Sequence, residues 1–299
     1  ENIISDRAYL EMIKAVLAER EAMFFDTLEQ NDSDLVVTVF VQTDRVSHMF
    51  YRGIDKEHPM YGDTGPEARG AIEWIYREAD RILGKTMDEL GPHDPLIVLS
   101  DHGFNPFRRT VHLNRWLVDH AYMTLKPGAP PSESLFTNVD WTKTRAYAIG
   151  LNGIYLNLAG RERLGIVRHD EAQALENELI AGLLELTDEK TGANVIDHVY
   201  AADAIYKGSE TDDAPDLVIG YGRGYRASWQ TTLGGVPEAL IEDNRERWSG
   251  DHCVDPPLVP GVLFTSFPLE SGVASIADVP ALIVGGFDST KGDTDAAHP

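Results

Sequence analysis

Five side chains of the kinds that bind divalent metal ions stand where the sequence predicts that strands end or begin. They are Asp44, His48, Asp101, His102 and His252. The first two follow the apolar run 35–41, the next two follow the apolar run 95–100, and the last precedes the apolar run 260–265. Ligands of open α/β sheets bind at the carboxyl ends of strands. Carboxylate and imidazole together are the ligand set of a catalytic zinc, or of manganese where oxygen ligands dominate.

The spacing within each group allows its members to meet at one point. Asp44 and His48 are four residues apart, so they share a face if the chain turns helical after the strand. Asp101 and His102 are adjacent, and Gly103 permits the tight turn that would direct both at one ion. Each short motif alone is weak, because such spacings and turn compositions are common. The combination of three groups beside three buried strands predicts a metallohydrolase.

The elements that would position these residues follow from hydrophobic periodicity. Helices are predicted over 6–30, 66–90, 112–125, 169–186 and 275–284. Strands are predicted over 35–41, 95–100, 146–150, 153–158, 216–221 and 260–265. The first strand, second helix and second strand read as a right-handed parallel crossover. We therefore expect one α/β domain over 1–299, with a mainly parallel sheet, helices on both faces and a candidate inserted lobe at 104–145.

Composition excludes several classes of protein. The chain has 299 residues, 42% of them hydrophobic, and a formal net charge of -23. An acidic surface disfavours nucleic-acid polymers and anionic membranes as partners. Cys253 is the single cysteine, so no disulfide can form within the chain. No apolar run reaches membrane-spanning length. A cytoplasmic location is slightly favoured, although an export signal could precede the sequence.

Three segments together resemble the alkaline phosphatase superfamily, and most closely its type I phosphodiesterase/nucleotide pyrophosphatase branch. They are Val41-Gln42-Thr43-Asp44-Arg45-Val46-Ser47-His48, Leu99-Ser100-Asp101-His102-Gly103-Phe104, and Ser249-Gly250-Asp251-His252 with the following Val259-Pro260-Gly261-Val262. The resemblance implies an alkaline-phosphatase-like sheet that carries two divalent metals at its carboxyl edge, most often zinc, with manganese as the alternative. It further implies in-line displacement at phosphorus by a Thr or Ser nucleophile.

Carried over residue by residue, the resemblance assigns the two metals to different groups. Asp44, His48 and His252 would hold one metal, and Asp101 with His102 would supply half of the second site. Family members begin with a strand that bears a further Asp, followed by the nucleophile. No such segment precedes residue 35 here, since Asp6 and Thr27 lie in a helical pattern. We therefore expect no catalytic nucleophile in this chain, a sheet that lacks its first strand, and little activity from the chain alone.

The missing segment leaves the partner and the exact function open. An upstream segment of a longer polypeptide, or a second chain, would complete the sheet. The main prediction is a phosphodiesterase or phosphatase that acts on a small phosphoester. The alternatives are a phosphomutase or phosphonate hydrolase of the same superfamily, or a non-catalytic domain that retains the metal site. A sulfatase is less favoured, because the Cys/Ser-x-Pro-x-Arg signature is missing.

Loops around the metal face hold the organic part of the substrate in such enzymes. Here these are residues 50–65 and 104–111, from which we select Tyr51 and Arg108 as candidate substrate-binding residues. An aromatic ring can stack on a nucleobase, and an Arg fork can pair with a phosphate. His112 follows closely and is a weaker candidate for lining the site. Alternatively, the aromatic residues of these loops pack onto the core.

Overall fold

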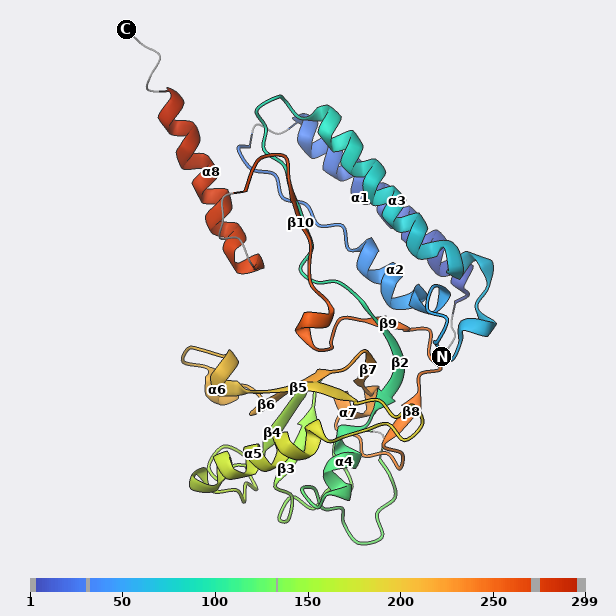
Figure 1. The fold of residues 1–299 in the computed structure, drawn as a ribbon, viewed down its shortest axis with the longest axis vertical. Helices are drawn as coiled ribbons and strands as arrows, with labels where there is room; N and C mark the ends of the chain where they lie inside the picture. Colours follow the sequence, from blue (N-terminus) through green and yellow to red (C-terminus); the bar gives the residue numbers. More distant parts are fainter. Residues whose placement is uncertain (1–3, 31–32, 133, 270–274, 295–299) are drawn as a thin grey trace.

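The computed structural model describes residues 4–30, 33–132, 134–269 and 275–294. Long helices lie together in one half of the molecule, and a four-stranded sheet with shorter helices lies in the other half (Figure 1). Each half has its own cluster of buried apolar side chains. The segments that bear the candidate metal ligands lie where the two halves meet.

The helical half contains α1 (Asp6–Gln30), α2 (Gln42–Phe50) and α3 (Pro66–Glu89). The predicted helices over 6–30 and 66–90 are thereby confirmed. One apolar stripe from each helix forms the core, as helical periodicity requires. This core consists of Leu10, Ile13, Leu17, Val46, Phe50, Ala68, Ala71, Ile75 and Ile82. Because α2 is fixed against both long helices, the residues on its other face have a rigid support.

The other half is built on an antiparallel sheet in the order β3-β4-β6-β5. Its strands are β3 (Ala146–Ile149), β4 (Gly153–Leu156), β6 (Leu217–Tyr221) and β5 (Ile196–Ala201). The helices α4 (Leu113–Asp119) and α5 (His169–Leu184) pack against it. Residues from 111 to 259 share this core, so the lobe predicted at 104–145 contributes to the same apolar cluster as the later strands.

A second sheet joins the two halves. Its central strand is β2 (Asn105–Val111), which begins just after the Asp101-His102 turn. It pairs in parallel with β7 (Gly224–Ala227), and antiparallel with β8 (Ile241–Asp243) and β9 (Gly250–Asp251). Because β9 pairs with β2 and also contacts α2, the three groups of candidate ligands are drawn together.

The prediction of a mainly parallel sheet is wrong for the described residues. Strand β1 (Ile97–Leu99) pairs only with β10 (Leu263–Thr265), and this pair is antiparallel, as are most others. The predicted strand over 35–41 is instead an extended segment without strand pairing. Val37 and Val39 expose 74% and 67% of their surface. The predicted parallel crossover from 35–41 to β1 is therefore absent from the described residues.

Several short elements complete the described chain. The remaining helices are α6 (Ala202–Ile205), α7 (Trp229–Thr232) and α8 (Val279–Thr294). Single 3₁₀ turns are η1 (Tyr51–Gly53), η2 (Tyr61–Asp63), η3 (Thr211–Asp213), η4 (Pro256–Leu258) and η5 (Ile276–Asp278). Helix α8 stands apart from the other helices (Figure 1). Within the described ranges, no helix has the length and apolar content needed to cross a bilayer.

A candidate metal centre between the two halves

Helix α2 presents two of the predicted ligands on one face. Asp44 and His48 are one turn apart, and the Nε2 atom of His48 lies 3.4 Å from Oδ1 of Asp44. The ring of His48 is buried, whereas 37% of the Asp44 side chain is exposed. The imidazole of His48 is therefore held by the core, whereas the carboxylate of Asp44 is open toward solvent.

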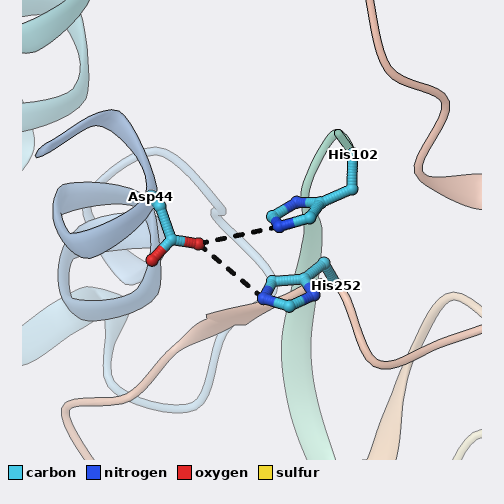
Figure 2. A group of neighbouring side chains, drawn as sticks. All are labelled: Asp44, His102 and His252. Carbon is cyan, nitrogen blue, oxygen red and sulfur yellow. Dashed lines mark ion pairs between the residues drawn. The ribbon is translucent and has the colours of Figure 1, made fainter. Parts of the chain in front are cut away.

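The other two histidines approach the same oxygen of Asp44 from different loops. The Nε2 atoms of His252 and His102 lie 3.7 Å and 3.9 Å from Oδ1 of Asp44 (Figure 2). The two imidazole rings are stacked, with centroids 3.6 Å apart and planes inclined by 18°. One donor atom from each of these three residues lies within 4.8 Å of the others. The compact donor group therefore consists of Asp44, His102 and His252, and His48 approaches the same carboxylate oxygen from outside this group.

This donor set fits a divalent metal such as zinc, which binds carboxylate oxygen and imidazole nitrogen. Asp101 lies beside it: its Oδ1 is 3.6 Å from Nε2 of His102, and 74% of its side chain is exposed. The arrangement differs from the predicted division into two groups, because His102 approaches Asp44 and His252 as well as Asp101. That these five residues bind metal remains a prediction.

Hydrogen bonds fix the orientation of two of the imidazoles. Nδ1 of His48 lies 2.8 Å from the carbonyl oxygen of Gly250, and Nδ1 of His102 lies 2.9 Å from that of Gly103. A carbonyl only accepts, so each Nδ1 carries the proton and each Nε2 keeps its lone pair. Histidine ligands of metals in proteins are oriented in the same way. Both Nε2 atoms are accordingly prepared to donate to a cation at Asp44.

Burial favours the neutral form of two of the imidazoles. It lowers the pKa of His48, against the opposing effects of the Gly250 carbonyl and the nearby carboxylates. It also lowers the pKa of His252, and the neighbouring His102 lowers it further. A metal ligand must be deprotonated, so a lowered pKa reduces the competition from protons.

Aromatic side chains that the motifs do not include support the histidines. Phe104 presents its edge to His48 and His252, with ring centroids 4.8 Å and 5.6 Å away. Trp248 stacks on His48 at 3.8 Å with an interplanar angle of 28°. Sequence reasoning placed Phe104 in a substrate loop and did not select Trp248. The only signal for Trp248 was its position four residues before His252.

The two predicted substrate-binding residues lie on adjacent loops and have other contacts. Arg108 places Nε 2.6 Å and Nη2 2.8 Å from the two carboxylate oxygens of Asp55, and it also contacts Glu57. Tyr51 packs so closely on Gly250 that a Cβ there would approach its Cβ to 2.8 Å. Their role in substrate binding remains a prediction. The weaker candidate, His112, is buried beside Glu242, with Nε2 2.9 Å from Oε2, outside the cluster.

A nearby buried histidine gives the protein a predictable response to pH. Nε2 of His58 donates to the carbonyl of Phe107 at 3.0 Å, and Nδ1 accepts from the backbone N–H of Met60 at 3.1 Å. Protonation would remove that acceptor, and burial lowers the pKa of His58 below its ordinary 6.5. The unfolded chain therefore binds more protons between these two pKa values, so stability falls as pH drops through 6.5.

We expect urea unfolding of the metal-free protein to show lower stability at pH 5.5 than at pH 7.5. His58→Gln keeps one donor and one acceptor but does not titrate, so its stability should depend less on pH. His93→Gln, in the loop after α3, is the control and should follow the wild type. An unchanged pH dependence in His58→Gln would contradict this assignment.

Comparison with known proteins identifies the family to which the chain belongs. The profile of the type I phosphodiesterase / nucleotide pyrophosphatase family matches residues 5–247. The chain belongs to this family, as the motifs around Asp44 and Asp101 predicted. The match ends five residues before His252, so the third motif is supported by geometry and not by the profile. No curated protein matches the chain.

Proposed function

We propose that this chain carries the metal-binding part of a phosphoester hydrolase with phosphodiesterase or nucleotide pyrophosphatase activity. The observation that carries the proposal is the approach of three imidazole Nε2 atoms to Oδ1 of Asp44, at 3.4, 3.7 and 3.9 Å. Family membership supports phosphoester hydrolysis. Two divalent ions would be held by Asp44, His48 and His252 together with Asp101 and His102. Zinc is the preferred ion and manganese is the alternative.

Bound metals would supply a Lewis acid for phosphoryl oxygens and a clamp for the attacking and leaving oxygens in an in-line displacement. The residues of this chain would orient the ions, and the lowered pKa values of His48 and His252 would favour their neutral forms. Cys253 is unsuited to act as the nucleophile, because burial and the Asp251 carboxylate raise the pKa of its thiol to about 12. A thiol of such pKa is protonated at neutral pH and reacts slowly.

The exposed run 35–41 supports a further element of the proposal. This β-branched segment beside α2 makes no strand pairing within the described residues, and most of its side chains are exposed. A segment of this kind can accept a further strand. We propose that an upstream segment or a second chain pairs here and brings the nucleophile to the metals. Residues 1–299 alone would then bind metal but turn substrate over slowly, because the covalent route is missing.

The test compares residues 1–299 with a longer polypeptide that includes the natural upstream sequence. Hydrolysis of bis-(4-nitrophenyl) phosphate is measured with added zinc, with added manganese and after chelation. We expect feeble turnover by residues 1–299, and robust, metal-dependent turnover by the longer chain. Absence of metal-dependent turnover by the longer chain with either ion would refute the proposal.

The same assay separates the proposed hydrolase from its alternatives, none of which would cleave the diester. A phosphomutase would move phosphate between positions of one substrate without releasing it, and a phosphonate hydrolase would cleave a carbon–phosphorus bond that the diester lacks. A non-catalytic domain would bind zinc in both polypeptides without turnover. Tyr51→Ala and Arg108→Ala in the active polypeptide would test substrate selection between nucleotide diesters and aryl monoesters.

A further inference from the structure

A single buried carboxylate beside the metal centre collects contacts from four directions. Asp251 is 1% exposed. Its Oδ1 accepts hydrogen bonds of 2.9 Å from the backbone N–H groups of His252 and Cys253. Its Oδ2 accepts a 2.6 Å hydrogen bond from Nε1 of Trp248 and lies 2.6 Å from Nε of Arg226. A buried aspartate held by three hydrogen bonds and one ion-pair contact has little freedom to move.

Arg226 is the counter-charge, and it is as deeply buried as its partner, at 2% exposure. Its Nη1 donates to the carbonyl of Ala227 at 2.9 Å, and its guanidinium carbon lies 4.0 Å from the ring centre of Trp229. The 2.6 Å contact acts mainly through charge, since Nε makes no well-directed hydrogen bond. Removing one member of such a pair leaves a buried charge without compensation, which is strongly unfavourable.

The contacts of Asp251 fix the position of His252. Two successive backbone N–H groups bond to one oxygen, so the turn that follows β9 has a set shape. That turn directs Nε2 of His252 to within 3.7 Å of Asp44. A different turn would point the imidazole elsewhere, since the remaining constraints on this backbone are the pairing of β9 with β2 and a longer 3.4 Å hydrogen bond from Asn152 Nδ2 to the carbonyl of Cys253.

The same carboxylate also acts on His48, through two neighbours in sequence. The indole of Trp248, whose N–H is bound to Asp251, stacks on the His48 ring. The carbonyl of Gly250, directly before Asp251, accepts from Nδ1 of His48 and so selects its tautomer. His48 and His252 come from distant parts of the chain, and both depend on the conformation of residues 248–252.

We propose that Asp251, with Arg226 as its counter-ion, is the positioning residue that places His48 and His252 together for metal binding. This proposal rests on the proposed metal site but is testable without metal. The four contacts of the Asp251 carboxylate go to Arg226, Trp248 and the backbone N–H groups of His252 and Cys253, so we assign it the role of holding ligands in place and not that of a ligand.

The test uses Asp251→Asn in residues 1–299. Asparagine has the same shape and keeps one acceptor oxygen, but it places a donor where Oδ2 of Asp251 faces Trp248 and Arg226. Histidine nitrogen spectra of the metal-free, ¹⁵N-labelled protein report the tautomer of His48, which is assigned with His48→Gln. We expect wild-type His48 to be wholly protonated at Nδ1, and the variant to show a mixture of tautomers. Zinc affinity should fall about ten- to a hundredfold, as for other residues that orient ligands.

The matched control is Asp188→Asn, which breaks another buried ion pair. In this pair Oδ2 of Asp188 lies 2.8 Å from Nε of Arg109, at the end of β2 that is far from the candidate metal site. It should leave the His48 tautomer and zinc affinity unchanged. The double variant Asp251→Asn/Arg226→Met removes the uncompensated cation, so it should regain stability while His48 stays mixed. An unchanged His48 tautomer in Asp251→Asn, or an equal effect in Asp188→Asn, would overturn the proposal. Absence of zinc binding in the wild type would refute the proposed function, whereas the tautomer would still decide the positioning role.

Discussion

Asp44→Ala should bind zinc more than about a hundredfold more weakly than the wild-type chain, because losing a residue that merely orients a ligand already costs ten- to a hundredfold. One oxygen of Asp44 lies within 3.9 Å of the Nε2 atoms of His48, His102 and His252. Its removal takes away a negative charge that all three imidazoles approach. Competition with a chromophoric chelator at pH 7.5 would measure the change.

The control for this prediction is Asp88→Ala, which removes an exposed carboxylate from α3 and alters the net charge equally. It should bind zinc with wild-type affinity. The unfolding free energy of metal-free Asp44→Ala should stay close to that of the wild type, since the carboxylate is partly exposed. Zinc binding by Asp44→Ala at wild-type strength would show that the ion occupies another place.

Trp116→Ala should lower the free energy of unfolding by about 3 to 5 kcal/mol, the usual cost of truncating a large buried aromatic side chain. Trp116 is among the largest fully buried side chains and lies in the core of the sheet half. Its ring stacks on Tyr122, and a Cβ at Gly182 of α5 would come within 3.1 Å of it. The cavity left behind has rigid walls on both sides, so little of the loss can be recovered.

Urea unfolding followed by circular dichroism would measure this loss. Phe264→Ala is the control, because this aromatic ring on β10 is mostly exposed, and its truncation should cost less than about 0.5 kcal/mol. Zinc affinity should survive in Trp116→Ala at low urea, since the metal centre uses no side chain of this core. Equal destabilisation by the two substitutions would mean that the sheet half is not the stability-limiting core.

The sequence predicted those parts of the fold that depend on local pattern. Helices α1, α3 and α5 follow from apolar periodicity. The short helix α2 meets the condition under which Asp44 and His48 were expected to share a face. The proximity of the histidine motifs followed from their places beside apolar runs and from family resemblance. Each of these signals lies within a few consecutive residues.

Strand pairing and the support of the site could not be predicted in this way. The run 35–41 has every local property of a buried strand, but pairing depends on whether a distant segment is available. The role of Asp251 likewise depends on Arg226 and Trp248, which meet it only after β7, β9 and β2 assemble. The sequence shows that Gly250 precedes Asp251, but it does not show why a glycine is needed there. The reason is the carbonyl oxygen of Ser47, which would lie 2.6 Å from a Cβ added at position 250.

The exposed run 35–41 also determines how the chain behaves in concentrated solution. Seven consecutive residues with high β-propensity, one polar side chain and no proline form the kind of segment that stacks into intermolecular sheets. The formal charge of -23 opposes such stacking, because the molecules repel one another. Salt shortens the range of that repulsion to about 8 Å at physiological ionic strength. Colloidal stability of the isolated chain therefore depends on its charge. Dilution and low salt preserve this stability, and raised ionic strength removes it.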